Sequence, residues 1–503
     1  MSPQPDVLEA PGNSHPFSKP PTVIRRIFSF PVTLAFSLAV LALLTVRGRL
    51  NDPDFWWHLK TGEIIWTTHA IPRVDVFSYT THHHAWIPHE WLAQWTLYGS
   101  WHAAGYSGIM LWLWLATTLL FVAVYALCAL YSGNAKVAFL GGLMVWFFST
   151  VGLAPRPHLL GYLLLTCELL LLHLGRTRNP RWFLALPPLF ALWVNVHGSF
   201  FMGMAVLAIF LACSLRSFTS ELLVNAPWTP RSRHLLWIAA ALSVLSLFLN
   251  PVGVDQVLYP LNVMLQQPLG VAAVEEWQPP QFSSDPRAMG LLLITGCLLA
   301  LPLLRRQAWR VEELLLLALA FASALGHSRM LFVFGVLAAP QVCRMFANDW
   351  DTYVAAKDRP LPNAVLMLLA GAVLFLAFPS SRDLSQQVDQ GNPSRAVAFI
   401  RHAGLTGNML NEYTEGGYLV WALPEHPVFV DGRGDVYEWT GVLREFGAWA
   451  TLQSDPQALL QKYQVNFCLL SQAAPMAHVF PYLPGWNKVY ADERSVIFAR
   501  QQP

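Results

Sequence analysis

Residues 51–60 read NDPDFWWHLK. The position of this stretch, directly after an apolar run, indicates the fold. The apolar run Ile27–Val46 is long enough to cross a bilayer as a helix. Carboxylates placed just after such a run, among tryptophan and histidine, are costly at a membrane surface unless they have a use. We therefore predict that residues 47–106 form the first outer loop of a membrane-embedded protein, and that its acidic residues are functional.

The composition indicates an integral membrane protein. Of the 503 residues, 54% are hydrophobic and only 12% are charged, whereas a soluble domain usually carries about twice that charged fraction. The formal net charge of +2 gives no indication of a nucleic-acid partner, and we expect none. The six cysteines show no ligand spacing, so we expect neither a zinc site nor a disulfide framework.

Hydropathy and charge together predict the topology. Lys19, Arg25 and Arg26 precede the first apolar run, which places the N-terminus in the cytoplasm by the positive-inside rule. Nearly every later basic cluster then falls on the inner side, and Arg156 and Arg329 are exceptions inside polar outer motifs. The apolar runs predict about eleven transmembrane helices, at residues 27–46, 107–131, 137–154, 159–175, 182–196, 199–215, 235–249, 288–304, 313–327, 330–343 and 363–379.

The chain divides into three predicted domains. Residues 1–26 are polar and proline-rich, which is typical of a disordered cytoplasmic tail. Residues 27–379 form the polytopic α-helical membrane domain, whose last span delivers residues 380–503 to the outer side as a soluble α/β domain. Its expected elements are helices at Pro393–His402 and Gly417–Leu423, strands at Asn408–Asn411, Pro427–Asp431 and Val465–Ser471, and a hairpin of Trp486–Tyr490 with Ser495–Arg500.

Two glycine-rich motifs stand out in this C-terminal part. Glu415–Tyr418 and Asp431–Asp435 combine glycines with charged residues beside apolar elements. Loops of this kind often carry function, but glycines also serve tight turns. The pattern favours structure or acceptor binding over catalysis.

Asp52 and Asp54 are the leading candidates for catalysis. Two carboxylates two residues apart can share a divalent metal such as Mg²⁺ or Mn²⁺, or one of them can act as a general base. Equally, aspartate is a favoured N-cap, and Phe55–Trp66 has the aromatic pattern of an interfacial helix. The residues alone leave both interpretations open.

The segment Asp54–Lys60 resembles the first-loop motif of oligosaccharyltransferase catalytic subunits, in which an aspartate precedes two aromatic residues, His or Asn, and a basic residue. The predicted topology of residues 20–380 is similar to that of the GT-C superfamily of membrane glycosyltransferases. The C-terminal part lacks the Trp-Trp-Asp-Tyr-Gly signature with which oligosaccharyltransferases read sequons. The resemblance therefore implies a bacterial GT-C branch that does not glycosylate asparagine.

The resemblance also implies a reaction. A sugar would pass, with inversion, from a polyprenyl-phosphate donor to a glycan, lipid or protein acceptor, on the outer face of the bacterial inner membrane. Asp54 would be the general base or metal ligand, supported by Asp52 and Glu90, and the expected cofactor is a divalent metal on Asp52 and Asp54. The guanidiniums of Arg156 and Arg329 suit the donor phosphate, although each could instead snorkel or make a structural ion pair.

Further polar residues are candidates for the wall of the active cleft. Glu90 could contact a metal or the acceptor, or it could favour a helix start through the macrodipole. Asn195 and His197 lie between two short spans, where polar backbone is tolerated beside a cavity, or where Gly198 allows close helix packing. The residues expected to line the cleft are His58, His89, His158, Asn195, His197 and Glu276.

Two other functions are compatible with the sequence. A transporter or flippase of a lipid-linked intermediate would hold its ion-coupling residues at mid-membrane. A non-catalytic envelope assembly protein would not bring Asp52, Asp54 and Glu90 together at a cavity. The positions of these acids in the fold therefore help to distinguish a glycosyltransferase from a transporter or an assembly protein.

Overall fold

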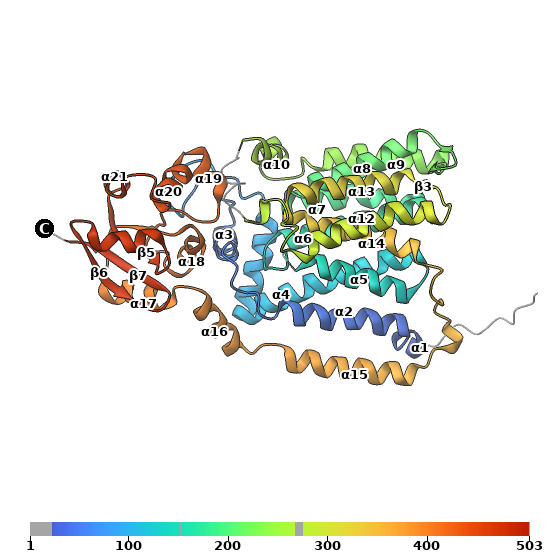
Figure 1. The fold of residues 1–503 in the computed structure, drawn as a ribbon, viewed down its shortest axis with the longest axis horizontal. Coiled ribbons are helices and arrows are strands. Elements are labelled where there is room, and N and C mark those ends of the chain that lie inside the picture. Colours follow the sequence, from blue (N-terminus) through green and yellow to red (C-terminus); the bar gives the residue numbers. More distant parts are fainter. Residues whose placement is uncertain (1–22, 151, 267–274, 502–503) are drawn as a thin grey trace, which may run out of the picture.

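The computed structural model describes residues 23–150, 152–266 and 275–501. Most of the disordered tail predicted for residues 1–26 lies outside the described residues, and its last part begins the short helix α1 (Val23–Ile27). Figure 1 shows long helices running side by side, with the C-terminal residues gathered at one end of them. Helix α3 (Phe55–Thr68) lies where these two parts meet and packs against both.

Every run predicted as a span coincides with a helix in the described part of the chain. Four described helices are long and apolar enough to cross a membrane, namely α4 (Trp91–Ser132), α6 (His158–Thr177), α12 (Pro286–Leu304) and α15 (Pro360–Ala377). Three are apolar but shorter, namely α2 (Phe30–Val46), α5 (Ala135–Ser149) and α8 (Phe200–Leu215). The others of this part are α7 (Leu186–Val196), α9 (Pro230–Ser246), α10 (Val254–Gln266), α13 (Val311–Gly326) and α14 (Leu331–Met345).

Helix α4 differs from the prediction because it begins inside the predicted first loop. The chain bends at Ala104 and Gly105, and the φ of 56° at Gly105 is one that glycine adopts easily. The bend lets the two halves of α4 take different directions (Figure 1). The predicted span 107–131 is therefore the second half of a longer helix.

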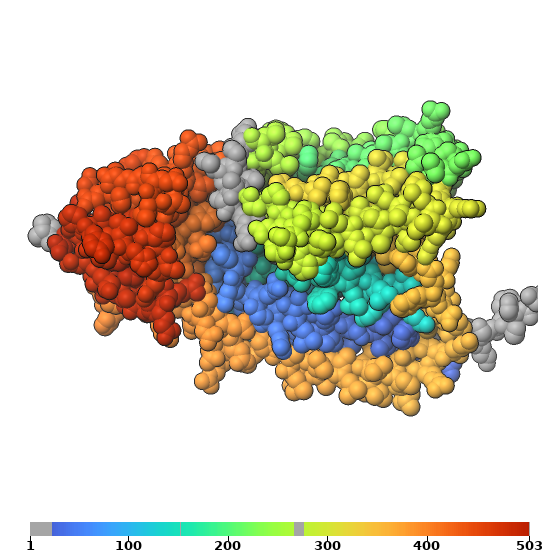
Figure 2. All heavy atoms as spheres, viewed as in Figure 1, coloured from blue at the N-terminus to red at the C-terminus, as the bar shows by residue number. Residues whose placement is uncertain are grey.

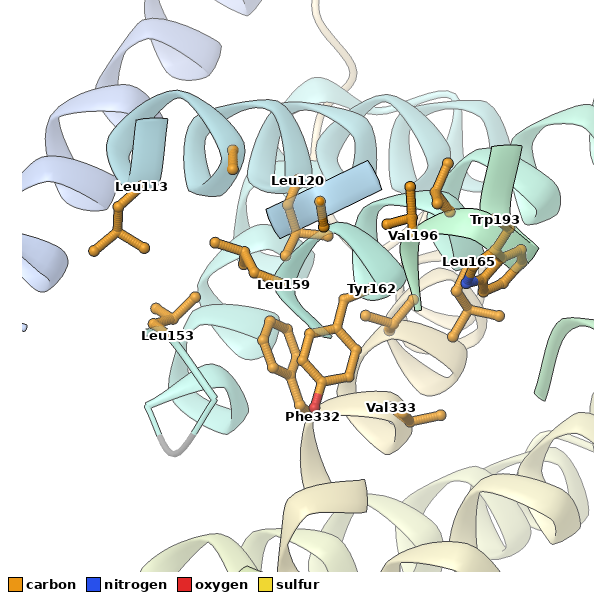
Figure 3. Close-up of a cluster of buried hydrophobic side chains, with 14 of the residues drawn as sticks. Leu113, Leu120, Leu153, Leu159, Tyr162, Leu165, Trp193, Val196, Phe332 and Val333 are labelled. Carbon is orange, nitrogen blue, oxygen red and sulfur yellow. The ribbon is translucent and has the colours of Figure 1, made fainter. Parts of the chain in front are cut away.

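A cluster of buried apolar side chains joins α4, α6, α7 and α14 (Figure 3). In it, the rings of Tyr162 and Phe332 lie beside each other with centroids 4.0 Å apart. Helix α14 is buried along nearly its whole length, as expected of a helix that is apolar on all sides. Helix α15 is the opposite, because Leu368 is 73% and Phe375 83% exposed. An apolar surface of this kind is suited to lipid rather than water.

The C-terminal residues form a four-stranded sheet in the order β4-β5-β7-β6. The strands are β4 (Asn408–Asn411), β5 (Val465–Ser471), β6 (Trp486–Ala491) and β7 (Ser495–Arg500), and β4 is parallel to β5 while the other pairs are antiparallel. The helices are α16 (Ser381–Gly391), α17 (Ser394–Ala403), α18 (Tyr413–Ala422), α19 (Gly434–Trp439), α20 (Val442–Ala450), α21 (Pro456–Lys462) and α22 (Pro475–Val479). A separate small sheet joins β1 (Phe218–Thr219), β2 (Leu223–Asn225) and β3 (Trp309–Arg310).

The strand predicted at Pro427–Asp431 is wrong, because this segment does not join the sheet. It runs instead beside the first loop, where Ser78 and Val428 form an isolated parallel bridge. The backbone N–H of Val428 donates to the Phe77 carbonyl at 3.0 Å, and that of Tyr79 donates to the Val428 carbonyl at 3.2 Å. These bonds attach the C-terminal residues directly to the first loop.

Candidate active site

Asp52 fixes the start of α3 and thereby the position of Asp54. Its Oδ1 accepts hydrogen bonds from the backbone N–H groups of Asp54 at 3.0 Å and Phe55 at 3.3 Å. This satisfies donors that a helix start leaves without partners. Behind this turn Trp56 is fully buried and makes an edge-to-face contact with Tyr418 of α18 at 5.2 Å. Asp54 thus stands at the beginning of a helix that is anchored from behind.

Arg156 lies at the centre of a charged cluster. Its Nε is 3.2 Å from Asp52 Oδ2, its Nη1 donates to Asp54 Oδ2 at 2.7 Å, and its Nη2 donates to Glu276 Oε2 at 3.3 Å. Arg329 reaches the other oxygen of Glu276, with Nη1 3.1 Å from Oε1. Three carboxylates from two distant parts of the chain therefore share two guanidiniums.

The pKa values separate the roles of these carboxyl groups. Burial, together with the charges of Asp52 and Glu276, raises the pKa of Asp54 to about 6, against the opposing charge of Arg156. The pKa of Glu276 lies below its ordinary value despite burial, because Arg329 and Arg156 stabilise the carboxylate. Of Asp54 and Glu276, Asp54 is therefore the residue whose carboxyl group can exchange a proton near neutral pH.

A cleft of about 920 Å³ opens in front of Asp54. One wall comes from the first loop and Arg156, a second from residues 276–287, and a third from the C-terminal residues Tyr413, Thr414 and Gly432. The side chain of Asp54 keeps 28% of its exposure, so its carboxylate can reach a bound molecule. The complete lining is Asp52, Pro53, Asp54, Arg156, Glu276, Gln278, Pro279, Pro280, Gln281, Ser284, Asp285, Pro286, Arg287, Ser328, Tyr413, Thr414 and Gly432.

Gly432 touches the carboxylate of Asp54, and a larger residue there would displace this carboxylate. A Cβ at position 432 would lie 1.9 Å from Asp54 Oδ1. The Tyr413 hydroxyl donates to the Gly432 carbonyl at 3.1 Å, which holds this backbone in place. The C-terminal residues therefore complete the site rather than merely adjoin it.

Gly432→Ala is expected to reduce activity by about 100-fold, because a misplacement of a reacting group by about 1 Å has effects of that order. The matched control is Gly447→Ala in α20, where an added Cβ meets nothing within 4 Å. Initial rates of the two variants, with heat-induced unfolding measured alongside, make the comparison. Equal activity of the two variants would contradict the contact between Gly432 and Asp54.

Glu90 belongs to a second cluster, in which Glu90 and His58 are buried and His89 and His197 are partly exposed. Its Oε1 lies 3.2 Å from His197 Nε2 and 3.7 Å from His89 Nε2, and its Oε2 lies 3.5 Å from His58 Nδ1. The backbone N–H of Ser199 donates to His197 Nδ1 at 2.9 Å, so the neutral His197 carries its proton on Nε2, the atom that faces Glu90.

Burial sets the charge of this histidine cluster. It raises the pKa of Glu90 to about 8 and lowers that of His89 to about 4. The pKa values of His58 and His197 lie well below their ordinary value for the same reason. At neutral pH the cluster therefore holds a protonated acid among uncharged imidazoles.

Not all residues predicted for the cleft wall lie there. Asp52, Asp54, Arg156 and Glu276 do. His58, His89, His197 and Glu90 lie instead in the second cluster, where the histidines contact Glu90, and Arg329 pairs with Glu276. Asn195 bonds to Trp91 Nε1 and to the carbonyls of Ala191 and Leu249, and His158 Nε2 bonds to the Gly152 carbonyl at 2.7 Å. Asn195 and His158 therefore support the backbone.

The expected metal site on Asp52 and Asp54 does not fit the arrangement of these residues. The carboxylate oxygens of Asp52 and Asp54 that could face a common ion face the guanidinium of Arg156 instead. Among the described residues, no group of three His, Cys, Asp or Glu side chains is arranged to hold a metal.

The cleft residues that the predicted site did not include are led by Tyr413, Thr414 and Arg287, which carry polar or charged groups. Gly432 lies in the Asp431–Asp435 motif, whose glycines and charges marked it as a candidate for acceptor binding. Arg287 shares with Arg156 the property of being a basic residue on the predicted outer side. An outer-side basic residue could therefore have been predicted as part of the site, whereas nothing in the sequence distinguishes Tyr413 from other aromatic residues.

No family model and no curated protein matches this chain. Solved structures do match it. ArnT from Cupriavidus metallidurans bound to undecaprenyl phosphate has a TM-score of 0.52 at 15% identity, over 93% of this chain and 97% of that one. The Archaeoglobus fulgidus oligosaccharyltransferase tethered with an acceptor peptide has a TM-score of 0.51 at 12% identity, over 93% and 74% of the two chains. Both are GT-C glycosyltransferases, and this chain therefore has a GT-C-like fold.

Proposed function

We propose that this protein transfers a sugar from a polyprenyl-phosphate donor to an acceptor, with Asp54 as the general base. The observation that carries the proposal is the position of Asp54, which is exposed to the cleft, held by Arg156, and has a pKa of about 6. The fold supports it, because one similar structure holds undecaprenyl phosphate and another an acceptor peptide.

In the proposed mechanism the Asp54 carboxylate accepts the proton of an acceptor hydroxyl or amine. The acceptor atom forms a bond to the anomeric carbon of the sugar, while the bond from that carbon to the phosphate oxygen breaks. The phosphate leaves with the electron pair of that bond, and one displacement inverts the configuration. Arg156 orients Asp54 and stabilises its charged form, and Asp52 holds both in place.

The proposed topology places this cleft outside the membrane. The sorting of basic residues supports a cytoplasmic N-terminus, about eleven spans and an extracytoplasmic domain of residues 380–503. The bacterial inner membrane is then the proposed location. The alternative of a transporter or flippase receives no support from Asp52, Asp54 and Glu276, which lie at a cleft beside the C-terminal residues.

The proposal is tested with the purified full-length protein in lipid nanodiscs and a panel of radiolabelled polyprenyl-phosphate sugars. A transferase releases polyprenyl phosphate and consumes the lipid-linked sugar when acceptor is supplied. A flippase moves the same lipid across a vesicle bilayer without cleaving it, so a parallel transport assay separates the two. Transport without cleavage would overturn the proposal.

The pH dependence should follow the pKa of Asp54. Only the deprotonated carboxyl can accept a proton, so kcat/KM should rise between pH 5 and pH 7 with a midpoint of about 6. Initial rates over this interval, corrected for loss of folded protein, provide the measurement. A rate that falls or stays constant as the pH rises through 6 would exclude Asp54 as the base.

A further inference from the structure

Two arginines meet at the mouth of the cleft, at the end of α5. Arg49 Nη1 donates to the Thr150 carbonyl at 2.7 Å, and Arg287 Nη1 donates to the Thr150 hydroxyl at 3.2 Å. Arg49 follows α2, Thr150 follows α5, and Arg287 lies in the first turn of α12. Three helices of the bundle thus bring two guanidiniums to one residue.

The charge at this point is not balanced. Arg287 forms a two-fold contact with Asp285, from Nε to Oδ1 at 2.8 Å and from Nη2 to Oδ2 at 2.9 Å. Arg49 is partly buried, and no ion pair between described side chains includes it. Burial and the charge of Arg287 lower the pKa of Arg49. One positive charge therefore has no counterion here, and an anion would stabilise it.

Arg156 and Arg329 are the arginines expected to bind the donor phosphate, but neither has an unbalanced positive charge. Their two charges face the three carboxylates of Asp52, Asp54 and Glu276. A phosphate placed against them would have to displace a carboxylate or share an already anionic neighbourhood. The spare positive charge lies at Arg49 instead.

The surroundings of Arg49 and Arg287 are those of a lipid rather than of a soluble anion. On α12, two and six residues after Arg287, Met289 is 54% and Leu293 69% exposed. Figure 2 shows the surface of α5 (teal) between α12 (yellow-green) and the N-terminal helices (blue). Arg287 also lines the cleft that contains Asp54. A lipid chain on this face would place its head group at the cleft.

We propose that Arg49, Arg287 and the Thr150 hydroxyl bind the phosphate of a lipid-linked phosphate at the mouth of the cleft. This inference rests on the proposed function, since it assigns the position of the donor phosphate. Arg49 supplies the uncompensated charge, and Arg287 and Thr150 supply further donors. The same chemistry would accept the head group of an anionic phospholipid, and the experiment must separate these two ligands.

The test measures binding of undecaprenyl phosphate and, separately, of phosphatidic acid to the full-length protein in detergent, by native mass spectrometry. Wild type is compared with Arg49→Gln, Arg287→Gln and the control Arg47→Gln, which removes an exposed charge two residues from Arg49. We expect Arg49→Gln to weaken binding of undecaprenyl phosphate by at least about tenfold, and Arg47→Gln to leave it unchanged. Arg49→Lys, which keeps the charge, should restore part of the affinity if the variant is folded.

Each outcome decides a different point. Equal binding by wild type and Arg49→Gln would overturn this site while the proposed transfer reaction stands. Equal dependence on Arg49 for phosphatidic acid and undecaprenyl phosphate, with no competition by the lipid-linked sugar, would assign the site to a structural phospholipid and overturn the donor role. Sugar transfer that is lost in Asp54→Asn but undiminished in Arg49→Gln at low donor concentration would also overturn it.

Discussion

Asp54→Asn is expected to lower the rate of sugar transfer by about 10²–10⁴-fold, the range that a general base contributes. Asparagine has nearly the same shape but cannot accept the proton of the acceptor. It also keeps an oxygen that can accept from Arg156 Nη1, which now lies 2.7 Å from Asp54 Oδ2. Folding should therefore be preserved, and the loss should appear in kcat. Single-turnover rates with a lipid-linked sugar measure it.

Two further variants serve as a control and a comparison for Asp54→Asn. Glu63→Gln removes a carboxylate from α3 whose ion pair, among the described residues, is with Lys60 on the same helix, and it should behave like wild type. Asp52→Asn should cause a smaller loss than Asp54→Asn, because Asp52 acts through the helix start and Arg156. A larger loss in Asp52→Asn, with Asp54→Asn near wild type, would transfer the role of base to Asp52.

The sequence predicts where the helices lie, but it does not predict which distant side chains contact one another. Apolar runs identify helices because each run must be buried or face lipid over its own length, which is a local property. The charge cluster is not local, since Arg156 lies about a hundred residues from Asp54 in sequence. An outer-side arginine is a candidate that the sequence alone can propose, but whether it contacts phosphate or carboxylate depends on which loops the fold brings to it.

The same limit explains why the strand predicted at Pro427–Asp431 is wrong and why Glu90 lies apart from Asp52 and Asp54. Pro427–Asp431 has the apolar composition of a strand, but its hydrogen-bond partner is the first loop and not the sheet. Glu90 and its histidines have the residue types of a catalytic site, and the fold places them against one another rather than beside Asp54. In both cases the residue types were recognised correctly, and the contact was decided by chain segments far away in sequence.

The attachment of the C-terminal residues to the first loop depends on Arg433. Its side chain is 1% exposed, with Nη1 2.7 Å from Asp75 Oδ1 of the first loop and Nη2 2.7 Å from Asp431 Oδ2. The rings of Phe77 and Trp86 each lie 4.7 Å from its guanidinium. The charges of Asp75 and Asp431 are fully buried, and Arg433 is the cation that both of them contact.

Arg433→Met should therefore destabilise this junction by about 3–5 kcal/mol, because it leaves two buried carboxylates without a counterion. We expect the midpoint of heat-induced unfolding of the C-terminal residues to fall by on the order of 10 °C, and activity to fall with it, because Gly432 touches Asp54. Limited proteolysis during heating measures the first effect. The control Arg444→Met, at an exposed position of α20, should change neither.

A second substitution distinguishes lost charge balance from lost packing. If buried charge causes the instability, Asp75→Asn in the Arg433→Met background should recover part of the midpoint, because one uncompensated carboxylate is removed. In the wild-type background the same Asp75→Asn should destabilise, because it removes a partner of Arg433. Opposite signs in the two backgrounds would show that the ion pair joins the first loop to the C-terminal residues. Destabilisation in both would assign the effect to the hydrogen bonds that Asp75 accepts from Phe77 and Ser78.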